Sequence, residues 1–359
     1  MKIKLAILDG DRNYLEKMRA AFVRRYSDEI EFYLFTAKNA ALDALYTSRI
    51  DVFLFNKNVD VSPEQIPGGC LYAYLSDFSG IESHNGRPVI CKFQRMDLIY
   101  KQILGVCAEN KWVVPGVKSS ESKGKVLLFC GASGGVGTSS AAAACAVRFS
   151  EKKKKVLYLS LQKLSGADLY FSGEGIKCMS DLILSLQDPE ANLRVQLQSW
   201  VKEDASGVCF FSQAKNPLDM MELDGEDILR LVSELKALGD YDYIILDVDL
   251  ALNRDMIPVY RAVDEIVMVG DHSRECTAKT DRALFALKAL DGKGDKPLTG
   301  RICLLYNRVG SEDEVDVSDP DVRVLGGVGI FKSDKTRKIA RNRKIIENLA
   351  TMEMFDRLM

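Results

Sequence analysis

Histidine is scarce in this chain, whose 359 residues include only His84 and His272. So few imidazoles leave little material for a histidine-based metal centre. The nine cysteines form no Cys-x-x-Cys pair, and several lie in apolar runs. We therefore expect buried, reduced thiols, as in a cytosolic protein, rather than disulfides or zinc ligands. We also expect no signal peptide, and no apolar run is long enough to span a bilayer.

An excess of charge of one sign is also lacking. The net charge is −2, with 28% charged and 47% hydrophobic residues, which is typical of a globular protein. This balance creates no overall field toward nucleic acid or an acidic membrane, so direct binding to either is not expected. A predicted helix at 335–349 is basic and amphipathic, as are many membrane- or DNA-binding helices, but we favour an ordinary solvated surface helix. Its basic residues are Lys335, Arg337, Lys338, Arg341, Arg343 and Lys344.

The first third of the chain alternates strand and helix patterns. Strands are predicted at 4–8, 30–35, 51–55, 70–75 and 89–91, and helices at 14–24, 40–46 and 96–107. Strands that alternate with helices indicate a parallel sheet with right-handed crossovers. We therefore place a first domain at 1–108. A small-polar stretch bounded by proline and glycine follows at 109–124 and is typical of a linker.

A second α/β series fills residues 125–359. Strands are predicted at 126–130, 155–159, 208–212, 243–247, 265–269 and 302–306, and helices at 138–150, 179–186, 226–238, 276–289 and 335–349. The predicted fold class is therefore α/β, with one parallel-sheet domain following another.

A glycine-rich loop joins the strand at 126–130 to the helix at 138–150. Glycines let backbone N–H groups turn toward an anion, and the helix N-terminus adds partial positive charge. Strand, loop and helix together predict a phosphate cradle of the P-loop NTPase kind. The candidate binding residues are Ser133, Gly134, Gly135, Val136, Gly137, Thr138, Ser139 and Ser140.

Other interpretations of this loop exist. Gly131 to Gly137 also resembles the loop with which quinone reductases of the medium-chain dehydrogenase family bind the pyrophosphate of NADPH. A purely structural glycine turn is a third interpretation. The apolar strand that ends in Asp247 favours a P-loop, because an acid-ended strand in a reductase lies much closer to its loop. Those reductases also need an all-β domain before the loop, and residues 1–108 do not predict one.

Residues 125–350 resemble the ParA/MinD family of deviant Walker ATPases, whose loop reads Lys-Gly-Gly-x-Gly-Lys-Thr-Thr. Ser133 and Thr138 stand where that family has its two lysines. By this resemblance Ser139 and Asp247 form the Mg²⁺ site, with the Ser139 hydroxyl on the ion and Asp247 holding a magnesium-bound water, and Asn307 reads the adenine of ATP. A strand-end Asn that makes an Asx turn is a close alternative for Asn307. The segment Asp271-His272-Ser273 stands at the family's switch position.

A further departure follows the second strand of this domain. The family usually has Asp-x-Asp there, but this chain has Ser160-Leu161-Gln162. Losing charge stabilisers of this kind lowers the rate of phosphoryl transfer by ~10³-fold or more. Nucleotide binding is expected to suffer less, because the backbone cradle remains. The prediction is an ATP-binding domain with weak or absent hydrolysis.

Residues 1–107 resemble a response-regulator receiver domain, which implies a flavodoxin-like fold. The corresponding positions are Asp9, Asp11, Asn56, Ser76 and Lys92. Asn56 replaces the phosphoacceptor aspartate, and an amide cannot form an acyl phosphate. The segment after Ser76 is also short for a fourth helix. The prediction is a degenerate receiver that serves as a docking or dimerisation surface.

The order of the two domains resembles TadZ/CpaE proteins, which position the Tad type IVb pilus secretion machinery. The resemblance implies a homodimer that binds ATP and acts as a localisation or assembly factor. Its partners would be pilus components or polar-localisation proteins, which would recruit it from the cytoplasm to the inner membrane face or a cell pole. Two other functions remain open, an NADPH-binding reductase and an active, MinD-like positioning ATPase.

Overall fold

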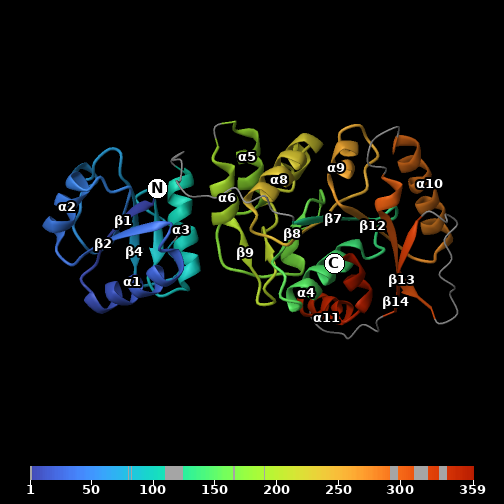
Figure 1. The fold of residues 1–359 in the computed structure, drawn as a ribbon, viewed down its shortest axis with the longest axis horizontal. Helices are drawn as coiled ribbons and strands as arrows, with labels where there is room; N and C mark the ends of the chain where they lie inside the picture. Colours follow the sequence, from blue (N-terminus) through green and yellow to red (C-terminus); the bar gives the residue numbers. More distant parts are fainter. Residues whose placement is uncertain are drawn as a thin grey trace. The chain divides into compact units, whose positions relative to one another are not determined.

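The structure is a computed structural model that describes residues 2–79, 81, 83–109, 124–164, 166–189, 191–291, 298–310, 322–330 and 338–359. Its contacts divide the chain into two compact units (Figure 1). The first unit holds Met1–Lys118 and Asp188–Trp200, and the second holds Ser119–Gln187 and Val201–Met359. Most of the predicted linker, residues 110–123, lies outside the described residues.

The first unit is built on a sheet with the strand order β2-β1-β3-β4-β6-β5. All neighbours pair in parallel except β5, which pairs antiparallel with β6. The five long strands thus have the flavodoxin-like order, which confirms the predicted receiver-like fold. The elements are β1 (Ile3–Leu8), α1 (Arg12–Tyr26), β2 (Ile30–Phe35), α2 (Lys38–Thr47), β3 (Val52–Asn56), β4 (Leu71–Ser76), β5 (Ser83–His84), β6 (Arg87–Cys91) and α3 (Met96–Glu109).

The middle of this unit has no α-helix among its described residues, and the sequence predicted none there. Between β3 and β4 the chain forms only a short 3₁₀ helix, Pro63–Gln65, and no α-helix. Pro67 and two glycines follow that turn, and such residues disfavour helix. Between β4 and β6 the described residues form the β5 turn instead, as the short segment after Ser76 predicted.

One face of this sheet is covered by helices from two distant parts of the sequence. Phe22 of α1 and Ile103 of α3 lie in its apolar core, and so does Val195 of α6 (Leu193–Trp200). Helix α6 packs on α3. The sequence did not predict this helix. The first unit is therefore discontinuous, because α6 lies in the middle of the sequence that forms the second unit.

The second unit is built on a sheet with the strand order β14-β13-β12-β7-β11-β8-β10-β9, parallel except at β9–β10. Four elements that the sequence did not predict are α7, α9, β9 and β14. The elements are β7 (Lys125–Cys130), α4 (Thr138–Glu151), β8 (Val156–Ser160), α5 (Met179–Gln187), β9 (Lys202–Glu203), β10 (Cys209–Phe210), α7 (Asp219–Glu222), α8 (Gly225–Leu238), β11 (Tyr243–Asp247), α9 (Met256–Ala262), β12 (Glu265–Gly270), α10 (Arg274–Asp291), β13 (Ile302–Val309), β14 (Arg323–Gly329) and α11 (Lys338–Ala350).

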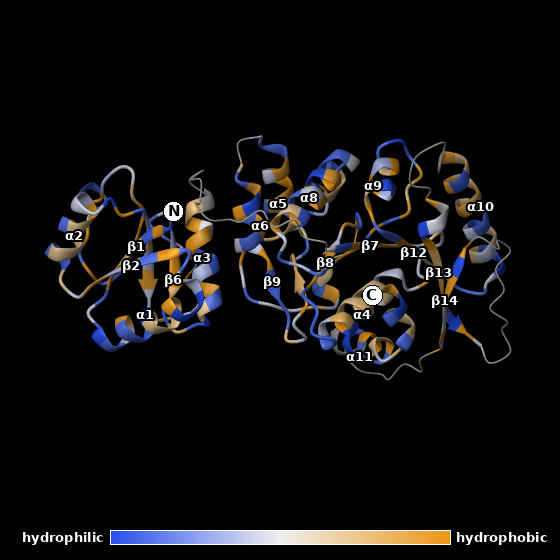
Figure 2. Cartoon of the chain, in the orientation of Figure 1, coloured by the Kyte–Doolittle hydropathy of each residue, from blue (hydrophilic) through white to orange (hydrophobic). Residues whose placement is uncertain are grey.

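Helices lie on both faces of this sheet. Figure 1 shows α4 and α11 on one side and α8, α9 and α10 on the other. The apolar colouring of β7, β12 and much of α4 in Figure 2 follows from this burial. Ile346 and Leu349 of the basic helix α11 are buried in the same core, so this part of its apolar face is covered within the unit. Lys335 and Arg337 lie outside the described residues.

The three central strands bring the predicted chemistry to one edge of the sheet. Strand β11 lies between β7 and β8, and Asp247 is in register with Phe129 on one side and Ser160 on the other. The glycine loop follows β7, and Gln162 follows β8. Ligands of open parallel sheets bind outside the carboxyl ends of the strands, which is where these residues lie.

Three properties of the described side chains and helices complete the description of the fold. All nine cysteines are free and most are buried, as predicted. Within the described ranges, no group of three or more His, Cys, Asp or Glu side chains could hold a metal ion. None of the described helices is long and apolar enough to cross a membrane.

Candidate nucleotide-binding site

The glycine loop lines a cavity of about 540 Å³. It leads into α4, whose N-cap is Gly137 with a left-handed φ of 95°. No side chain caps this helix, so its first N–H groups are left open to an anion. Seven of the eight predicted loop residues line the cavity, and the eighth, Val136, is buried in the core behind the loop.

Two glycines of the loop leave no room for a side chain. A Cβ on Gly131 would lie 2.6 Å from Thr138 Oγ1, and a Cβ on Gly137 would lie 2.3 Å from Asn307 Nδ2. Gly135 has a φ of +75° but open space around it. The loop is thus closely packed on its inner side and open on its outer side, as a backbone cradle for phosphate requires.

Uncharged side chains occupy the two positions that would carry lysines. Ser133 is half-buried in the cavity lining, and Thr138 is buried with its hydroxyl near Gly131. Both side chains are uncharged, and both are too short to reach over a bound phosphate as a lysine would. The loop alone therefore supplies hydrogen bonds and a helix dipole but no full positive charge.

Arg308 is the only cationic side chain among the described residues that line this cavity. It follows Asn307 near the end of β13, has a left-handed φ of 59°, and donates a hydrogen bond of 2.8 Å to the Gly135 carbonyl. Asp271 lies 4.0 Å from its guanidinium. The sequence did not single out Arg308, and its place beside the predicted Asn307 was the signal that could have done so.

Asn307 supports the loop from behind. Its Nδ2 donates 2.8 Å to the carbonyl of Val136, and its Oδ1 accepts from the N–H of Arg308. Both ends of the amide are thus engaged by backbone groups. Reading of adenine by Asn307 stays a prediction, and the structure assigns it a bracing role in the loop.

Ser139 and Asp247, the residues of the predicted magnesium site, are joined through a third side chain. Ser139 Oγ donates 3.1 Å to Gln162 Oε1, and Gln162 Nε2 donates 3.3 Å to Asp247 Oδ1. Tyr158 donates 2.8 Å to the other oxygen of Asp247. Gln162 thus accepts from Ser139, and Gln162 and Tyr158 each donate one hydrogen bond to Asp247, so all three oxygens keep lone pairs for a magnesium ion or its bound water. Their role toward magnesium stays a prediction.

Asp247 is fully buried at the end of β11. Burial raises its pKa from 3.8 to about 6, although the hydrogen bond from Tyr158 opposes the shift. The carboxylate is still mostly ionised at neutral pH, so its charge must be stabilised by the donors around it.

Two further polar side chains complete the cavity. Tyr170 lies 3.3 Å from Ser140, hydroxyl to hydroxyl, and Asp249 accepts from the N–H of Lys163 at 3.0 Å. Lys163 itself donates to the carbonyls of Met220 and Leu223, and burial lowers its pKa. Asp249 could have been found from the sequence, since it stands two residues after Asp247, whereas no sequence signal marks Tyr170.

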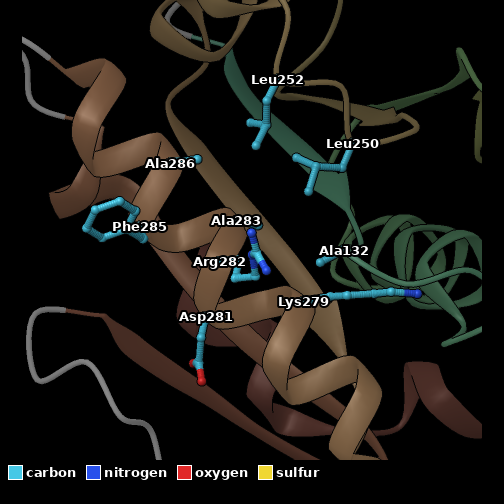
Figure 3. A pocket seen from close by; sticks show the side chains of 9 residues that line it. All are labelled: Ala132, Leu250, Leu252, Lys279, Asp281, Arg282, Ala283, Phe285 and Ala286. Carbon is cyan, nitrogen blue, oxygen red and sulfur yellow. The ribbon is translucent and has the colours of Figure 1, made fainter.

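A second cavity, of about 720 Å³, adjoins the loop at Ala132 (Figure 3). Leu250 and Leu252 line one side, and the exposed ring of Phe285 on α10 lines the other. Lys279 of α10 extends toward the side where Ala132 lies, but its Nζ is paired with Glu275 at 2.6 Å. This cavity is therefore more apolar than the one over the loop.

The predicted switch segment caps helix α10. Asp271 Oδ1 accepts from the N–H and the hydroxyl of Ser273, and the hydroxyl of Ser273 accepts from the N–H of Cys276. The hydrogen bonds from Ser273 hold the pKa of Asp271 below its usual range, with a smaller effect of Arg308. His272 stacks on Tyr306, with ring centroids 4.9 Å apart. Arg308 thus links this segment to the glycine loop.

The receiver-like unit brings its own predicted polar residues together. Lys92 contacts Asp9 and Asp77 at 2.8 Å each, and Asn56 donates 3.2 Å to Asp9. Burial alone would lower the pKa of Lys92, but its hydrogen bonds with Asp77 and Asp9 raise it above the ordinary value. Asn56 Oδ1 accepts from the N–H of Asn58. The cluster has the receiver arrangement with an amide at the phosphoacceptor position.

A parallel sheet with a glycine loop at its carboxyl edge defines the second unit as a P-loop-type domain. Comparison with known proteins agrees with this class. The chain is 22% identical over 226 residues to the septum site-determining protein MinD of Escherichia coli strain K12, covering 61% of this chain and 82% of MinD.

Two solved structures give weaker likenesses. A ParA family ATPase from Chlorobium tepidum TLS has 19% identity and a TM-score of 0.49, covering 66% of this chain and 96% of its own. MinD from Pyrococcus horikoshii OT3, complexed with Mg-ADP, has 17% identity and a TM-score of 0.39. The match covers 63% of this chain and 95% of the MinD chain.

Residues 1–108 match the family described as "TadZ-like, receiver domain". The chain therefore combines a TadZ-like receiver domain with a ParA/MinD-like P-loop domain, as the sequence predicted.

Proposed function

We propose that the second unit binds ATP or ADP in the cavity over the glycine loop. The observation that carries the proposal is the uncapped N-terminus of α4 behind a loop with Gly135 and Gly137 at positive φ. These features direct N–H groups at an anion without any side chain. Arg308, at the rim of the loop, supplies the positive charge that the replaced lysines would otherwise give.

The same site supports weak or absent hydrolysis. Stabilisation of charge that develops on the transferred phosphoryl group depends on cations aimed at it, and Ser133 and Thr138 cannot supply one. After β8, Gln162 is an amide that already bridges Ser139 and Asp247, so it cannot act as a base toward water. We infer that bound nucleotide serves as a structural or switching ligand rather than as fuel.

We further propose that the protein forms a homodimer that helps to localise or assemble Tad pilus machinery, at the inner face of the membrane or a cell pole, through partners. The TadZ-like description of residues 1–108 supports the pilus role. The amide at Asn56 supports a receiver that is not phosphorylated and is used for docking. The nucleotide would stabilise the assembly-competent form.

Calorimetric titration of the full chain with ATP, ADP and NADPH tests the proposal. We expect binding of the adenine nucleotides and none of NADPH. Tight binding of NADPH alone would overturn it in favour of a reductase. Gly135→Val should abolish nucleotide binding, because a side chain there blocks the approach of phosphate to the backbone. Gly86→Val is the matched control, since Gly86 has a φ of +72° and open space around it, in the other unit.

Phosphate release and molar mass test the remaining parts. We expect slow or undetectable release of phosphate and a dimer by light scattering with ATP present. Fast turnover that requires the dimer would instead identify a positioning ATPase of the MinD kind. A chain that stays monomeric at all nucleotide concentrations would rule out the homodimer.

A further inference from the structure

The segment that follows β8 forms one wall of the cavity over the glycine loop. Gln162 and Tyr170 both lie in this segment, and both line the cavity. They contact two successive hydroxyls in the first turn of α4. Gln162 accepts from Ser139 at 3.1 Å, and the hydroxyl of Tyr170 lies 3.3 Å from that of Ser140. The first turn of a helix is where an anion binds, so Tyr170 lies at the phosphate end of the cavity.

The hydroxyls of Ser140 and Tyr170 make only a weak contact with each other. Their separation of 3.3 Å exceeds the range of about 2.5–3.0 Å that is usual between two hydroxyl oxygens. Two hydroxyls also carry two protons, and a single hydrogen bond between them uses one. The other proton is available to a third group in the cavity.

Tyr170 is a hydrogen-bond donor at neutral pH. Burial raises the pKa of its phenol above the ordinary value of 10.0, although hydrogen bonding with Ser140 opposes the shift. The phenol therefore keeps its proton. A phosphate oxygen is a charged acceptor, and a hydrogen bond to it is roughly twice as strong as one between neutral groups. Exchanging Ser140 for a phosphate would thus be favourable for this hydroxyl.

The ring of Tyr170 is held in position from the core. It follows the 3₁₀ turn Ala167–Leu169, and its N–H donates 2.9 Å to the carbonyl of the first residue of that turn. The next residue, Phe171, is buried and packs on Tyr158 and Phe210, with ring centroids 5.2 and 5.8 Å away. A side chain that is positioned in advance loses little conformational entropy when a ligand binds.

We propose that Tyr170 is a nucleotide-binding residue, whose hydroxyl turns from Ser140 to donate a hydrogen bond to a phosphate oxygen of bound ADP or ATP. The inference rests on the proposed nucleotide site. Ser133 and Thr138 supply no positive charge, so binding depends on the loop N–H groups, on Arg308 and on hydroxyl donors. Tyr170 adds one such donor from outside the glycine loop.

Calorimetric titration of the variant Tyr170→Phe with ADP and with ATP tests this inference. The exchange removes one oxygen and keeps the ring. We expect both dissociation constants to rise about tenfold, as for the loss of one hydrogen bond to a charged group. Affinities equal to those of the wild-type chain would overturn the inference and leave the proposed site standing. Absence of binding by the wild-type chain would overturn the proposed function itself.

Tyr243→Phe is the matched control. Tyr243 begins β11, and its hydroxyl donates 3.2 Å to the carbonyl of Met359. It belongs to the same unit as Tyr170 but does not line the cavity. This variant should bind both nucleotides as the wild-type chain does. Equal losses of affinity in the two variants would overturn the inference, because they would reflect a general loosening of the unit.

Thermal unfolding separates contact with the nucleotide from support of α4. Without nucleotide, we expect Tyr170→Phe to melt at the wild-type temperature, because the contact that it loses is weak. At a fixed concentration of ADP, its melting temperature should rise less than that of the wild-type chain. A variant that melts lower without nucleotide but gains as much from ADP as the wild-type chain would give Tyr170 a structural role and overturn the inference.

Discussion

Arg308 concentrates the positive charge of the proposed nucleotide site in one side chain. It lines the cavity and reaches the loop through the Gly135 carbonyl. A hydrogen bond between a guanidinium and a phosphate contributes about 1.5–3 kcal/mol, which corresponds to about tenfold or more in affinity. We expect Arg308→Gln to weaken ADP binding by that factor, measured by calorimetry. Arg323→Gln, which removes a cation of β14 that is paired with Glu265 of β12, should leave affinity unchanged. Equal affinity in both variants would remove Arg308 from the site.

Asp247 makes the stability of the second unit depend on pH. Its pKa is raised from 3.8 to about 6 by burial, so the folded chain holds this proton more tightly than the unfolded chain. The protonated form is favoured by folding, and stability should fall as pH rises from about 4 to about 6, by about 3 kcal/mol in total. Above pH 6 the whole destabilisation is present.

Asp247→Asn removes this titration. We expect denaturant unfolding from about pH 5 to about pH 8 to show that the free energy of unfolding of the variant rises relative to that of the wild-type chain as pH rises. Asp249→Asn, the same exchange at an exposed carboxylate nearby, should keep the wild-type slope. Parallel curves for wild type and Asp247→Asn would show that Asp247 does not titrate in this range.

The location of single site residues could be predicted from the sequence where a residue has a fixed position in a motif. Ser139 and Asp247 lie together because a loop and an adjacent strand end meet at one sheet edge. The bridge by Gln162 could not be predicted, because it depends on the rotamer of a side chain two residues beyond β8. Tyr170 was missed for a related reason, since it reaches Ser140 from a segment without a motif.

At the scale of elements, the junction of the glycine loop with α4 depends on Gly137. Alanine there would have to adopt a φ of +95° and would place its Cβ 2.3 Å from Asn307 Nδ2. A left-handed L-residue costs about 1–2 kcal/mol before the clash is counted. We expect Gly137→Ala to destabilise the second unit by about 2 kcal/mol or more in denaturant unfolding.

Gly134→Ala is the control for that prediction. Gly134 lies in the same loop, without positive φ and with open space around it, so the exchange should change stability by less than about 0.5 kcal/mol. Equal losses in the two variants would mean that the loop tolerates a side chain at Gly137.

Element prediction succeeded where an apolar run was long and buried. Strands β7 and β11 and helix α4 are of this kind, and their predicted bounds differ from the observed ones by at most a residue. Strand β14 was missed because its sequence contains three glycines and little apolar periodicity. Pairing with β13 stabilises it in spite of that sequence. Helix α6 was missed for a comparable reason, since it is stabilised by packing on α3, a contact between segments far apart in the sequence.

At the scale of the whole molecule, α6 makes the first unit depend on a distant part of the sequence. Val195 is buried in the core that α3 also lines. An unpaired carboxylate at this place should cost at least about 3 kcal/mol. We expect Val195→Asp in the full chain to lower the unfolding midpoint of the first unit and leave that of the second unaffected, as followed by calorimetry.

Leu184→Asp provides the comparison, because Leu184 is 68% exposed on α5 of the second unit. It should shift neither midpoint. A Val195→Asp chain with the wild-type first midpoint would show that α6 does not stabilise the receiver-like fold.

The two units share one property that only the complete chain reveals. Each keeps the scaffold of a phosphate-handling domain, and each replaces a charged group at its centre by an amide or a hydroxyl: Asn56 in the first, and Ser133, Thr138 and Gln162 in the second. Both polar clusters are internally satisfied by hydrogen bonds. This agreement between the two sites supports the proposal made above, in which the protein binds nucleotide and positions partners.

The discontinuity of the first unit has a consequence for any attempt to exchange or remove it. A protein assembled from modules joined end to end can lose one of them by a single cut. Here a cut after α3 would leave that helix without α6, and would leave α6 without α3 in the remaining fragment. A protease that nicks the chain after α3 should therefore yield two pieces that migrate together until denaturant is added. Recombination between relatives would have to transfer two separate stretches of the gene at once to move this domain intact.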